Sequence, residues 1–414
     1  MKSQLPGLMK ERGLEAIAVL GGGIDNPVMT YMTGLARLMR SMFVMRANGE
    51  SLLVHNPMER DEAAPTGLPR MDFVQAGLKG FTEEEGSDAG GEARMLCHVL
   101  EKLGASGKVA LYGKVEANRL LFQAELIKKK MSNIEIVFDG EKSIFDTARI
   151  TKDAAEINRM RDVGRRTCEA LAIARNLLFS CRVSGHNVVR PGGSLLKLGD
   201  LREVLRGELT KRGLAERSGT ILSMGRDSAV PHNFGNDDAA VEPGKTIIFD
   251  VFPGEIGGGY AFDITRTYCV GDVPAGVRRI YDDVKEAHRL SMEALEVDTF
   301  ARVYQDKVCD FFEARGYATI RQNEAIEEGY VHGLGHGIGL EVHERPRLAG
   351  SQANVDKLIP GMVFTVEPGL YFPSKGMAVR IEDIVFARPD GKFEVLVEFP
   401  RELSGYPGGL TDVA

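Results

Sequence analysis

The chain has 414 residues, of which 43% are hydrophobic and 27% charged, enough to bury a core in each of two domains. The formal net charge is −7 and no basic run stands out, which argues against a nucleic-acid partner. The five scattered cysteines, the lack of a signal-peptide-like start and the absence of any run of 18 apolar residues predict a cytoplasmic protein with reduced thiols and no membrane span.

Helical and strand-like segments alternate over residues 1–148, which predicts an α/β domain. Asn48-Gly49 separates two apolar runs and predicts a hairpin. The triple glycine from Gly21 predicts a turn, because no GK[ST] follows it as in a phosphate-binding loop. The acidic, glycine-rich residues 82–91 predict an exposed loop. We expect helices at 4–12, 92–103 and 116–130, and strands at 16–20, 41–47, 51–55, 108–112 and 134–138.

A second domain is predicted over residues 149–414. Thr151 or Asp153 can cap a long helix that carries acidic residues in its first turn and apolar residues at helical spacing. Another helix is expected at 196–212, ended by Gly213. After this point the sequence becomes strand-like.

The stretch from His332 to Glu344, HGLGHGIGLEVHE, holds three of the chain's eight histidines among four glycines. The glycines argue against a helix, since each costs roughly 0.8–1 kcal/mol relative to alanine in a helix interior. In a strand, His332 and His336 share a face, while His343 points the other way unless the chain bends after Gly339. The alternative is a glycine-rich surface loop with incidental histidines.

Four carboxylates lie within apolar, strand-like segments of the second domain. They are Asp250 in TIIFDV, Asp263 in GYAFDITRT, Glu367 in MVFTVEPGLY and Glu382 in VRIEDIVF. Each alone has a structural alternative, such as a turn cap, a pairing with an arginine or a charge on an edge strand. Together they would be costly to bury and would repel one another. With His336, they predict a shell for two divalent metal ions.

Mostly oxygen ligands with one nitrogen suit Mn²⁺, Co²⁺, Fe²⁺ or Zn²⁺, and Mn²⁺ is our first expectation among them. The sequence alone does not discriminate between these ions.

These segments resemble the motifs of the pita-bread metallopeptidases, a family that includes methionine aminopeptidase, Xaa-Pro aminopeptidase and prolidase. The resemblance rests on DVFPGEIGGGYAFDITRT, HGLGHGIGLEVHE, VEPGLY and RIED, and it covers residues 150–405. It implies an α+β fold in which helices cover a curved antiparallel sheet, preceded by a smaller α/β domain of the creatinase and prolidase type. The implied metal ligands are Asp250, Asp263, His336, Glu367 and Glu382. One departure is a longer turn between the two aspartates, at PGEIGGG.

The resemblance also implies roles for the remaining residues. A hydroxide bridging the metals would attack the scissile carbonyl, while Glu367 accepts and passes on a proton. His343 would donate to the developing oxyanion, and His232, in SAVPHNFGN, would lie near the leaving nitrogen. His332 and Arg380 are expected to contact the substrate. For Arg380, orientation of Glu382 or a structural ion pair are the alternatives.

The predicted function is therefore a dinuclear metal-dependent peptidase that hydrolyses the Xaa-Pro bond at the N-terminus of peptides with proline in second position. The N-terminal domain favours this proline-directed branch, in which a homodimer is expected. The alternatives are a strict Xaa-Pro dipeptidase, a metal-free hydrolase of the creatinase type and a non-enzymatic binding protein on the same fold.

Overall fold

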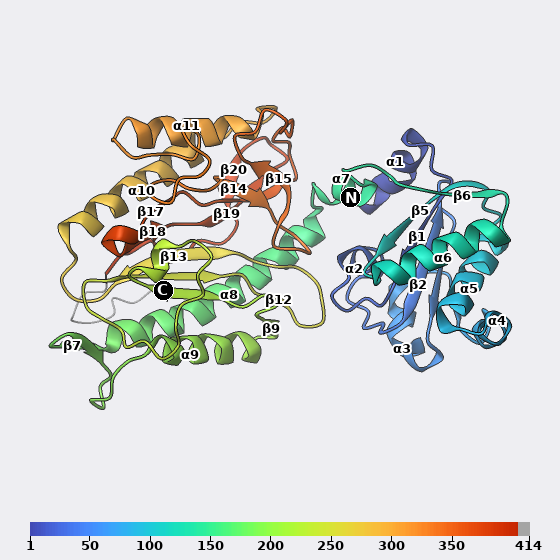
Figure 1. Ribbon diagram of the computed structural model, residues 1–414, viewed down its shortest axis with the longest axis horizontal. Helices are drawn as coiled ribbons and strands as arrows, with labels where there is room; N and C mark the ends of the chain where they lie inside the picture. The colour runs from blue at the N-terminus through green and yellow to red at the C-terminus, as the bar shows by residue number, and fades with distance from the viewer. Residues whose placement is uncertain (405–414) are drawn as a thin grey trace. The chain divides into compact units, whose positions relative to one another are not determined.

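A computed structural model describes residues 1–404 of the chain (Figure 1). The chain divides into two compact units. The first unit contains Met1–Arg149 together with Gly257–Gly259, and the second contains Ile150–Ile256 and the residues from Tyr260 onward. No helix within residues 1–404 is long and apolar enough to cross a membrane.

The first unit is built on a six-stranded mixed sheet with the strand order β4-β3-β2-β1-β5-β6. The central strand β1 (Ala16–Leu20) pairs antiparallel with β2 (Ser41–Arg46) and parallel with β5 (Gly107–Gly113). The predicted hairpin is confirmed, because β2 pairs antiparallel with β3 (Ser51–His55). The other elements are β4 (Arg70–Asp72), β6 (Ile134–Val137), α1 (Leu5–Glu11), α2 (Pro27–Thr33), α3 (Arg60–Ala63), α4 (Leu78–Glu85), α5 (Asp88–Lys102), α6 (Ala117–Lys130) and α7 (Ile144–Arg149).

All five residues of β1 are buried, as expected for a strand covered on both faces. Ala16 and Ala18 lie on one face and share a core cluster with Leu96 and Leu100 of α5. This arrangement of helices on a mixed sheet agrees with the α/β domain predicted from the sequence.

The prediction of an exposed loop at residues 82–91 is wrong, because the segment forms the end of α4 and the start of α5. Gly86 ends α4 in the left-handed region at φ 66°, and the Ser87 side chain caps α5 by accepting from the Gly90 N–H. A Cβ placed on Gly91 would lie 2.2 Å from the Thr82 hydroxyl oxygen. The glycines that suggested a loop therefore allow two helices to pack closely.

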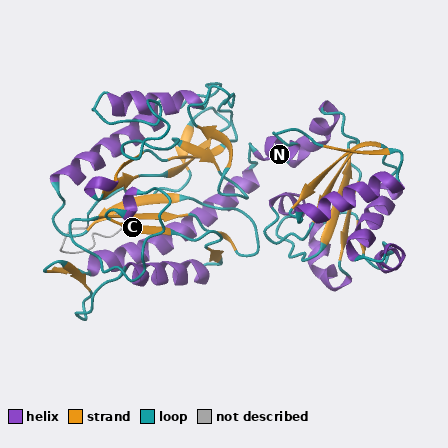
Figure 2. Cartoon of the chain, in the orientation of Figure 1, coloured by secondary structure: helices purple, strands orange, loops and turns teal. Residues whose placement is uncertain are grey.

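The second unit begins with the long helix α8 (Ala154–Ser180), whose predicted cap is confirmed. The Asp153 carboxylate accepts from the Glu156 N–H at 2.9 Å, and the Glu156 carboxylate accepts from the Asp153 N–H at 2.8 Å. Next come α9 (Leu198–Lys211), α10 (Ala275–Glu293) and α11 (Arg302–Glu313). In Figure 2, seen in the orientation of Figure 1, the central strands of this unit lie between α8 and α9 on one side and α10 and α11 on the other.

Two antiparallel sheets form the centre of the second unit. The first has the order β10 (Ile221–Met224), β11 (Thr246–Val251), β13 (Ile264–Cys269). The second has the order β15 (Glu344–Leu348), β14 (Gly335–Gly337), β16 (Val363–Val366), β19 (Asp383–Ala387), β20 (Phe393–Val395). Three short ladders complete the unit: β17 (Gly369–Phe372) with β18 (Met377–Arg380), β9 (Leu214–Ala215) with β12 (Gly254–Glu255), and β7 (Arg182–Ser184) with β8 (Asn187–Val189).

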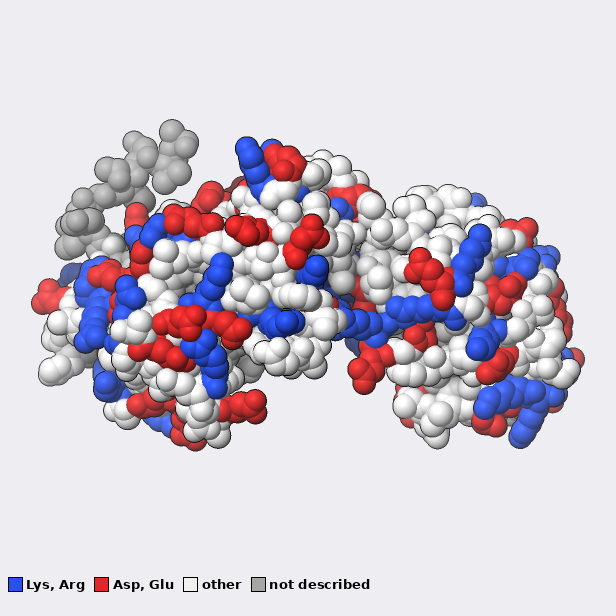
Figure 3. Space-filling model, turned by 90° about the horizontal axis from the view of Figure 1, so that it is seen from above, with Lys and Arg blue, Asp and Glu red and all other residues white. Residues whose placement is uncertain are grey.

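Acidic and basic side chains are interspersed on the face of the molecule seen in Figure 3, over the surfaces of both units. Several carboxylates of the second unit are buried in its interior.

Candidate metal centre

Two aspartates reach the centre of the second unit from neighbouring strands of its three-stranded sheet. Asp250 lies in β11 and faces Thr265 across the ladder with β13, while Asp263 immediately precedes β13. Both side chains are buried, with only 7% and 4% of each residue exposed. The antiparallel pairing therefore brings together two carboxylates that are 13 positions apart in the sequence.

Three further side chains come from adjacent strands of the five-stranded sheet. His336 is the middle residue of β14, Glu367 directly follows β16, and Glu382 directly precedes β19. Because β16 lies between β14 and β19, these three residues lie close together at one end of the three strands. The expected continuous strand through Glu382 is interrupted, since β18 ends at Arg380 and pairs with β17, whereas β19 pairs with β16.

The two groups of residues converge. Ligand atoms of Asp263, His336 and Glu382 all lie within 4.8 Å of one another. The Nε2 atom of His336 is 3.4 Å from a Glu367 carboxylate oxygen and 3.8 Å from an Asp263 oxygen. Its Nδ1 atom is 3.1 Å from the Gly337 carbonyl oxygen, an arrangement that directs Nε2 toward the carboxylates.

Asp250 adjoins this group through an arginine. Its carboxylate forms a short, buried ion pair with the Arg380 guanidinium. Arg380 also donates to the Tyr371 hydroxyl at 2.8 Å and to the Thr265 hydroxyl at 3.2 Å. The structure thus places Arg380 in an ion pair with Asp250, which agrees with the structural ion pair that the sequence left open as an alternative to contact with substrate or orientation of Glu382.

Burial and mutual repulsion disfavour the ionised forms of these carboxylates. Burial raises the pKa of Asp263 and of Glu382 well above the usual range, and the charges of the neighbouring carboxylates raise it further. Burial, together with the charge of Asp250, raises the pKa of Glu367 to about 8 despite the nearby Arg380. The cluster therefore needs additional positive charge if all its members are to be ionised at neutral pH.

The donor set fits divalent metal ions. Asp263 Oδ1 and Glu382 Oε1 are buried and have no hydrogen-bond partner among the described residues. Leaving such an atom unsatisfied costs about 1–3 kcal/mol, so two of them aimed into one acidic cluster are exceptional. Metal ions would satisfy both atoms and offset the repulsion, and four carboxylates with one imidazole suit ions of the Mn²⁺ to Zn²⁺ group.

His343 approaches the cluster from outside it. The chain reverses its direction between β14 and β15. This reversal agrees with the bend after Gly339 that the sequence allowed. The His343 and His336 rings are 4.3 Å apart at their centroids and inclined by 68°. Burial and a nearby His232 lower the pKa of His343, although both side chains remain accessible to solvent.

His332 is held by two polar contacts within the second unit. Its Nε2 atom is 2.8 Å from the Tyr371 hydroxyl, and its Nδ1 atom is 2.7 Å from the Gly333 carbonyl oxygen. Burial, and secondarily the charge of Arg380, lower the pKa of His332 to about 3, so the ring is neutral at pH 7. Through Tyr371 and Arg380, a chain of hydrogen bonds leads from His332 to Asp250.

The sequence profile of metallopeptidase family M24 matches residues 158–389, more than half of the chain. The chain belongs to metallopeptidase family M24. The matched region contains all five candidate ligands, and the family implies divalent metal ions.

Curated relatives of this M24 chain include the probable dipeptidase PepE of Mycobacterium tuberculosis, 32% identical over 259 residues, which span 63% of this chain and 61% of that protein. The Xaa-Pro dipeptidase of Pyrococcus furiosus is 36% identical over 184 residues, which span 44% of this chain and 48% of that protein. The matches therefore cover less than two thirds of either relative.

Solved structures resemble the M24 chain over nearly its whole length. The dipeptidase of Pyrococcus horikoshii OT3 has a TM-score of 0.75 at 22% identity, covering 97% of this chain and 99% of that chain. The X-Pro aminopeptidase of Thermotoga maritima MSB8 has a TM-score of 0.72 at 22% identity, covering 98% and 99%. This likeness concerns the fold, and it confirms the predicted pita-bread fold with a preceding α/β domain.

Sequence reasoning missed the hydroxyl groups that orient the candidate ligands of this M24 chain. Thr265 donates to a Glu382 oxygen at 2.6 Å. Thr365 donates to a Glu367 oxygen at 3.2 Å and accepts from the His336 N–H. Each threonine lies two residues from a candidate ligand, so the two-residue period of a strand was the available signal.

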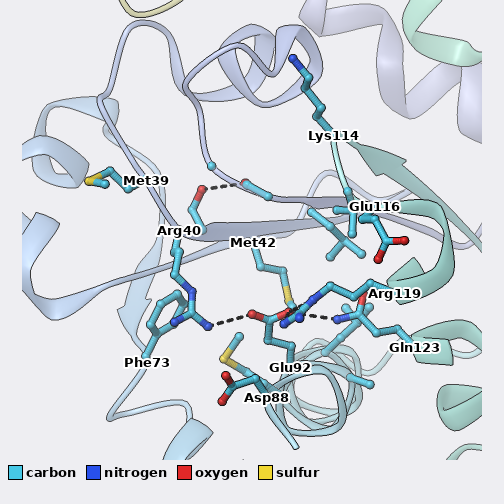
Figure 4. A pocket seen from close by; sticks show the side chains of 18 residues that line it. Met39, Arg40, Met42, Phe73, Asp88, Glu92, Lys114, Glu116, Arg119 and Gln123 are labelled. Atoms are coloured by element: carbon cyan, nitrogen blue, oxygen red, sulfur yellow. Dashed lines mark hydrogen bonds and ion pairs between the residues drawn. The ribbon is translucent and has the colours of Figure 1, made fainter. Parts of the chain in front are cut away.

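A separate cavity of about 510 Å³ lies within the first unit of the M24 chain, beside the ends of β1 and β5 (Figure 4). None of the predicted site residues lines it. Glu92 binds Arg40 and Arg119 there and accepts from Gln123. A Cβ on Gly22 would lie 2.3 Å from the Met39 carbonyl oxygen, so close backbone packing explains a glycine at this turn.

Proposed function

We propose that this M24 chain is a dinuclear metal-dependent peptidase that hydrolyses the Xaa-Pro bond at the N-terminus of peptides. The observation that carries the proposal is the buried carboxylate cluster with its two unpartnered oxygens beside His336. The names of several relatives, among them the Xaa-Pro dipeptidase of Pyrococcus furiosus, support the substrate class. The residues proposed to hold the two ions are Asp250, Asp263, His336, Glu367 and Glu382.

Divalent ions bound there would lower the pKa of a water molecule and polarise the scissile carbonyl. Glu367 suits the proton transfer, because its side chain is 16% exposed at the rim of the cluster and is oriented by Thr365. It would take a proton from the attacking water and return it to the leaving nitrogen. His343, beside His336 but outside the cluster, would donate to the carbonyl oxygen as negative charge develops.

His232 is proposed to assist at the leaving nitrogen. It lies in an exposed loop close enough to His343 and His332 for its charge to lower the pKa of both. An Xaa-Pro bond is a tertiary amide, so its nitrogen has no hydrogen to donate and must gain a proton before it leaves. Arg380 is proposed to hold Asp250 and Tyr371 in position, and His332 is proposed to hold Tyr371.

A strict Xaa-Pro dipeptidase is the second candidate function, since the relatives include proteins named as dipeptidases. Both functions use the same cluster and differ in how much peptide they accept beyond proline. A metal-free hydrolase or a binding protein on this fold is less well supported, because all five candidate ligands are present. Mn²⁺ as the metal, a homodimer and a cytoplasmic location stay predictions.

The deciding experiment assays metal-reconstituted protein against Ala-Pro, Ala-Pro-Ala and Ala-Pro-Ala-Ala, each beside the counterpart with alanine in place of proline. We expect cleavage after the first residue of the proline peptides alone. Cleavage of Ala-Pro only would select the strict dipeptidase. Equal cleavage of both series would reject proline specificity, and no cleavage with metal bound would reject the peptidase proposal.

A further inference from the structure

The candidate metal centre is assembled from two sheets that do not share a ladder among the described residues. Asp250 and Asp263 come with the three-stranded sheet, whereas His336, Glu367 and Glu382 come with the five-stranded sheet. The distance between these two halves must therefore be set by contacts other than strand pairing. Some of these contacts lie between β13 and the start of β19.

We infer that the buried Arg266–Asp383 pair is a positioning unit that fixes the two halves of the metal centre relative to each other. The inference deepens the proposed function and rests on it. Arg266 lies in β13, three residues after Asp263, and Asp383 directly follows Glu382. Both side chains are 1% exposed, and their closest atoms are 2.7 Å apart.

Every N–H of the Arg266 guanidinium has an acceptor. Its Nε donates to the Pro400 carbonyl at 2.9 Å. Its Nη1 donates to the Thr265 carbonyl at 2.9 Å and to the Glu382 carbonyl at 2.7 Å. Its Nη2 donates to Asp383 at 2.7 Å and to the Phe399 carbonyl at 2.8 Å. One planar group thus holds the backbone of β13, the start of β19 and the segment 399–400 in a fixed arrangement.

Asp383 is held from the other side as well. The Arg401 guanidinium donates to its second oxygen at 2.7 Å, and His288 of α10 lies 3.1 Å from that oxygen. These partners compensate the buried charge of Asp383 and attach it to the helical layer. Rotation of the carboxylate away from Arg266 is thereby opposed.

The pair faces away from the candidate ligands. Successive side chains of a strand point to opposite faces, so Arg266 and Asp383 lie on the reverse side from Asp263 and Glu382. Their influence on the centre must pass through the backbone, where the Glu382 N–H also donates to the Thr265 carbonyl at 3.1 Å. Arg266 and Asp383 are therefore positioning residues, and they do not touch the reacting groups.

Arg266→Lys tests the inference, because it keeps the charge and removes the planar group that spans five acceptors. Arg289→Lys is the matched control, since Arg289 also forms ion pairs but is 51% exposed on α10. Each protein is stripped of metal, checked by circular dichroism and thermal unfolding, and titrated with Mn²⁺ by calorimetry. Electron paramagnetic resonance then reports whether two bound ions form a coupled pair.

We expect Arg266→Lys to fold, to bind the second equivalent of Mn²⁺ roughly 10–100-fold more weakly, and to lose the coupled-pair signal. Arg289→Lys should bind both equivalents as the wild type does. A folded Arg266→Lys protein with wild-type affinities and signal would overturn the inference. If that variant does not fold, Asp383→Asn replaces it, and failure of both to fold would make the pair purely structural and overturn the inference.

The wild-type titration separates this inference from the proposed function. Wild-type protein that binds fewer than two equivalents contradicts the dinuclear function and the inference together. Wild-type protein that binds two equivalents while Arg266→Lys also binds them normally contradicts the inference alone.

Discussion

Arg380 and Asp250 form a buried ion pair at the border of the candidate metal centre. Only 3% of Arg380 is exposed, and its guanidinium also holds Tyr371 and Thr265. One arginine thus contacts a proposed metal ligand, the threonine that orients a second ligand and the tyrosine that binds His332. The arrangement makes Arg380 a partner that orients a proposed ligand, which is a role that lysine cannot fill with a single ammonium group.

Arg380→Lys should therefore keep the fold but weaken the centre. We expect metal affinity or turnover to fall roughly 10–100-fold, as is typical when a group that orients a metal ligand is changed. Calorimetric Mn²⁺ titration and steady-state kinetics measure the two effects. The control is Arg289→Lys, a surface residue that pairs only with neighbours on its own helix among the described contacts. Unchanged affinity and turnover in Arg380→Lys would contradict the role.

Asp263→Asn should lower the bound metal from two equivalents toward one or fewer and abolish turnover. The carboxylate lies within 4.8 Å of His336 and Glu382, and one of its oxygens has no described partner. An amide offers a weaker ligand and no negative charge. Elemental analysis of the purified variant measures the loss, with the exposed Asp238→Asn as control. Full occupancy with normal turnover would remove Asp263 from the ligand set.

His343→Ala should retain both metal ions and its fold while turnover falls about 10²–10³-fold, the usual effect of removing one oxyanion donor. KM should change much less, because the contact strengthens as charge develops on the carbonyl oxygen. His186→Ala, an exposed histidine elsewhere in this unit, is the control. Turnover within a few-fold of the wild type would mean that His343 only packs beside His336, whereas loss of metal would make it a ligand.

The metal-free protein should lose stability as the pH rises from about 6.5 to 8, above the range in which the lowered pKa values of His332 and His336 act in the opposite direction. Glu367 has a pKa near 8 in the folded chain, and about 4.3 is usual for a glutamate in an unfolded chain. In this interval the folded state binds more protons than the unfolded state, so the free energy of unfolding falls with increasing pH. Urea unfolding at about pH 6.5 and pH 8 measures the effect, which added Mn²⁺ should cancel at pH 8. Greater stability at pH 8 without metal would contradict it.

Much of the site could be predicted because its carboxylates stand within otherwise apolar segments of the sequence. Asp250 and Glu367 stand out as carboxylates in apolar segments. Asp250 is indeed buried, and a Glu367 carboxylate oxygen lies 3.4 Å from the Nε2 atom of His336. The pairing of Arg380 with Asp250 could not be predicted, because it depends on how two ladders far apart in the sequence meet. The break in the strand at Glu382 was missed for the same reason, since β18 and β19 read as one apolar run.

Local composition misled the prediction where packing decided the structure. The segment around Gly90 and Gly91 was expected to be a loop, yet it starts a helix that packs closely on another. Glycine permits both arrangements, and composition alone does not show that Gly91 packs closely against Thr82.

The most direct test of the account is a metal titration of activity. Metal-free protein is supplied with increasing equivalents of Mn²⁺, and cleavage of Ala-Pro-Ala is followed beside Ala-Ala-Ala. The proposed function predicts no turnover without metal and no turnover of the alanine peptide. Turnover of the proline peptide should reach its plateau as the second equivalent of Mn²⁺ binds. Cleavage of Ala-Pro-Ala by protein shown to be free of metal, or none when two equivalents are bound, would contradict it.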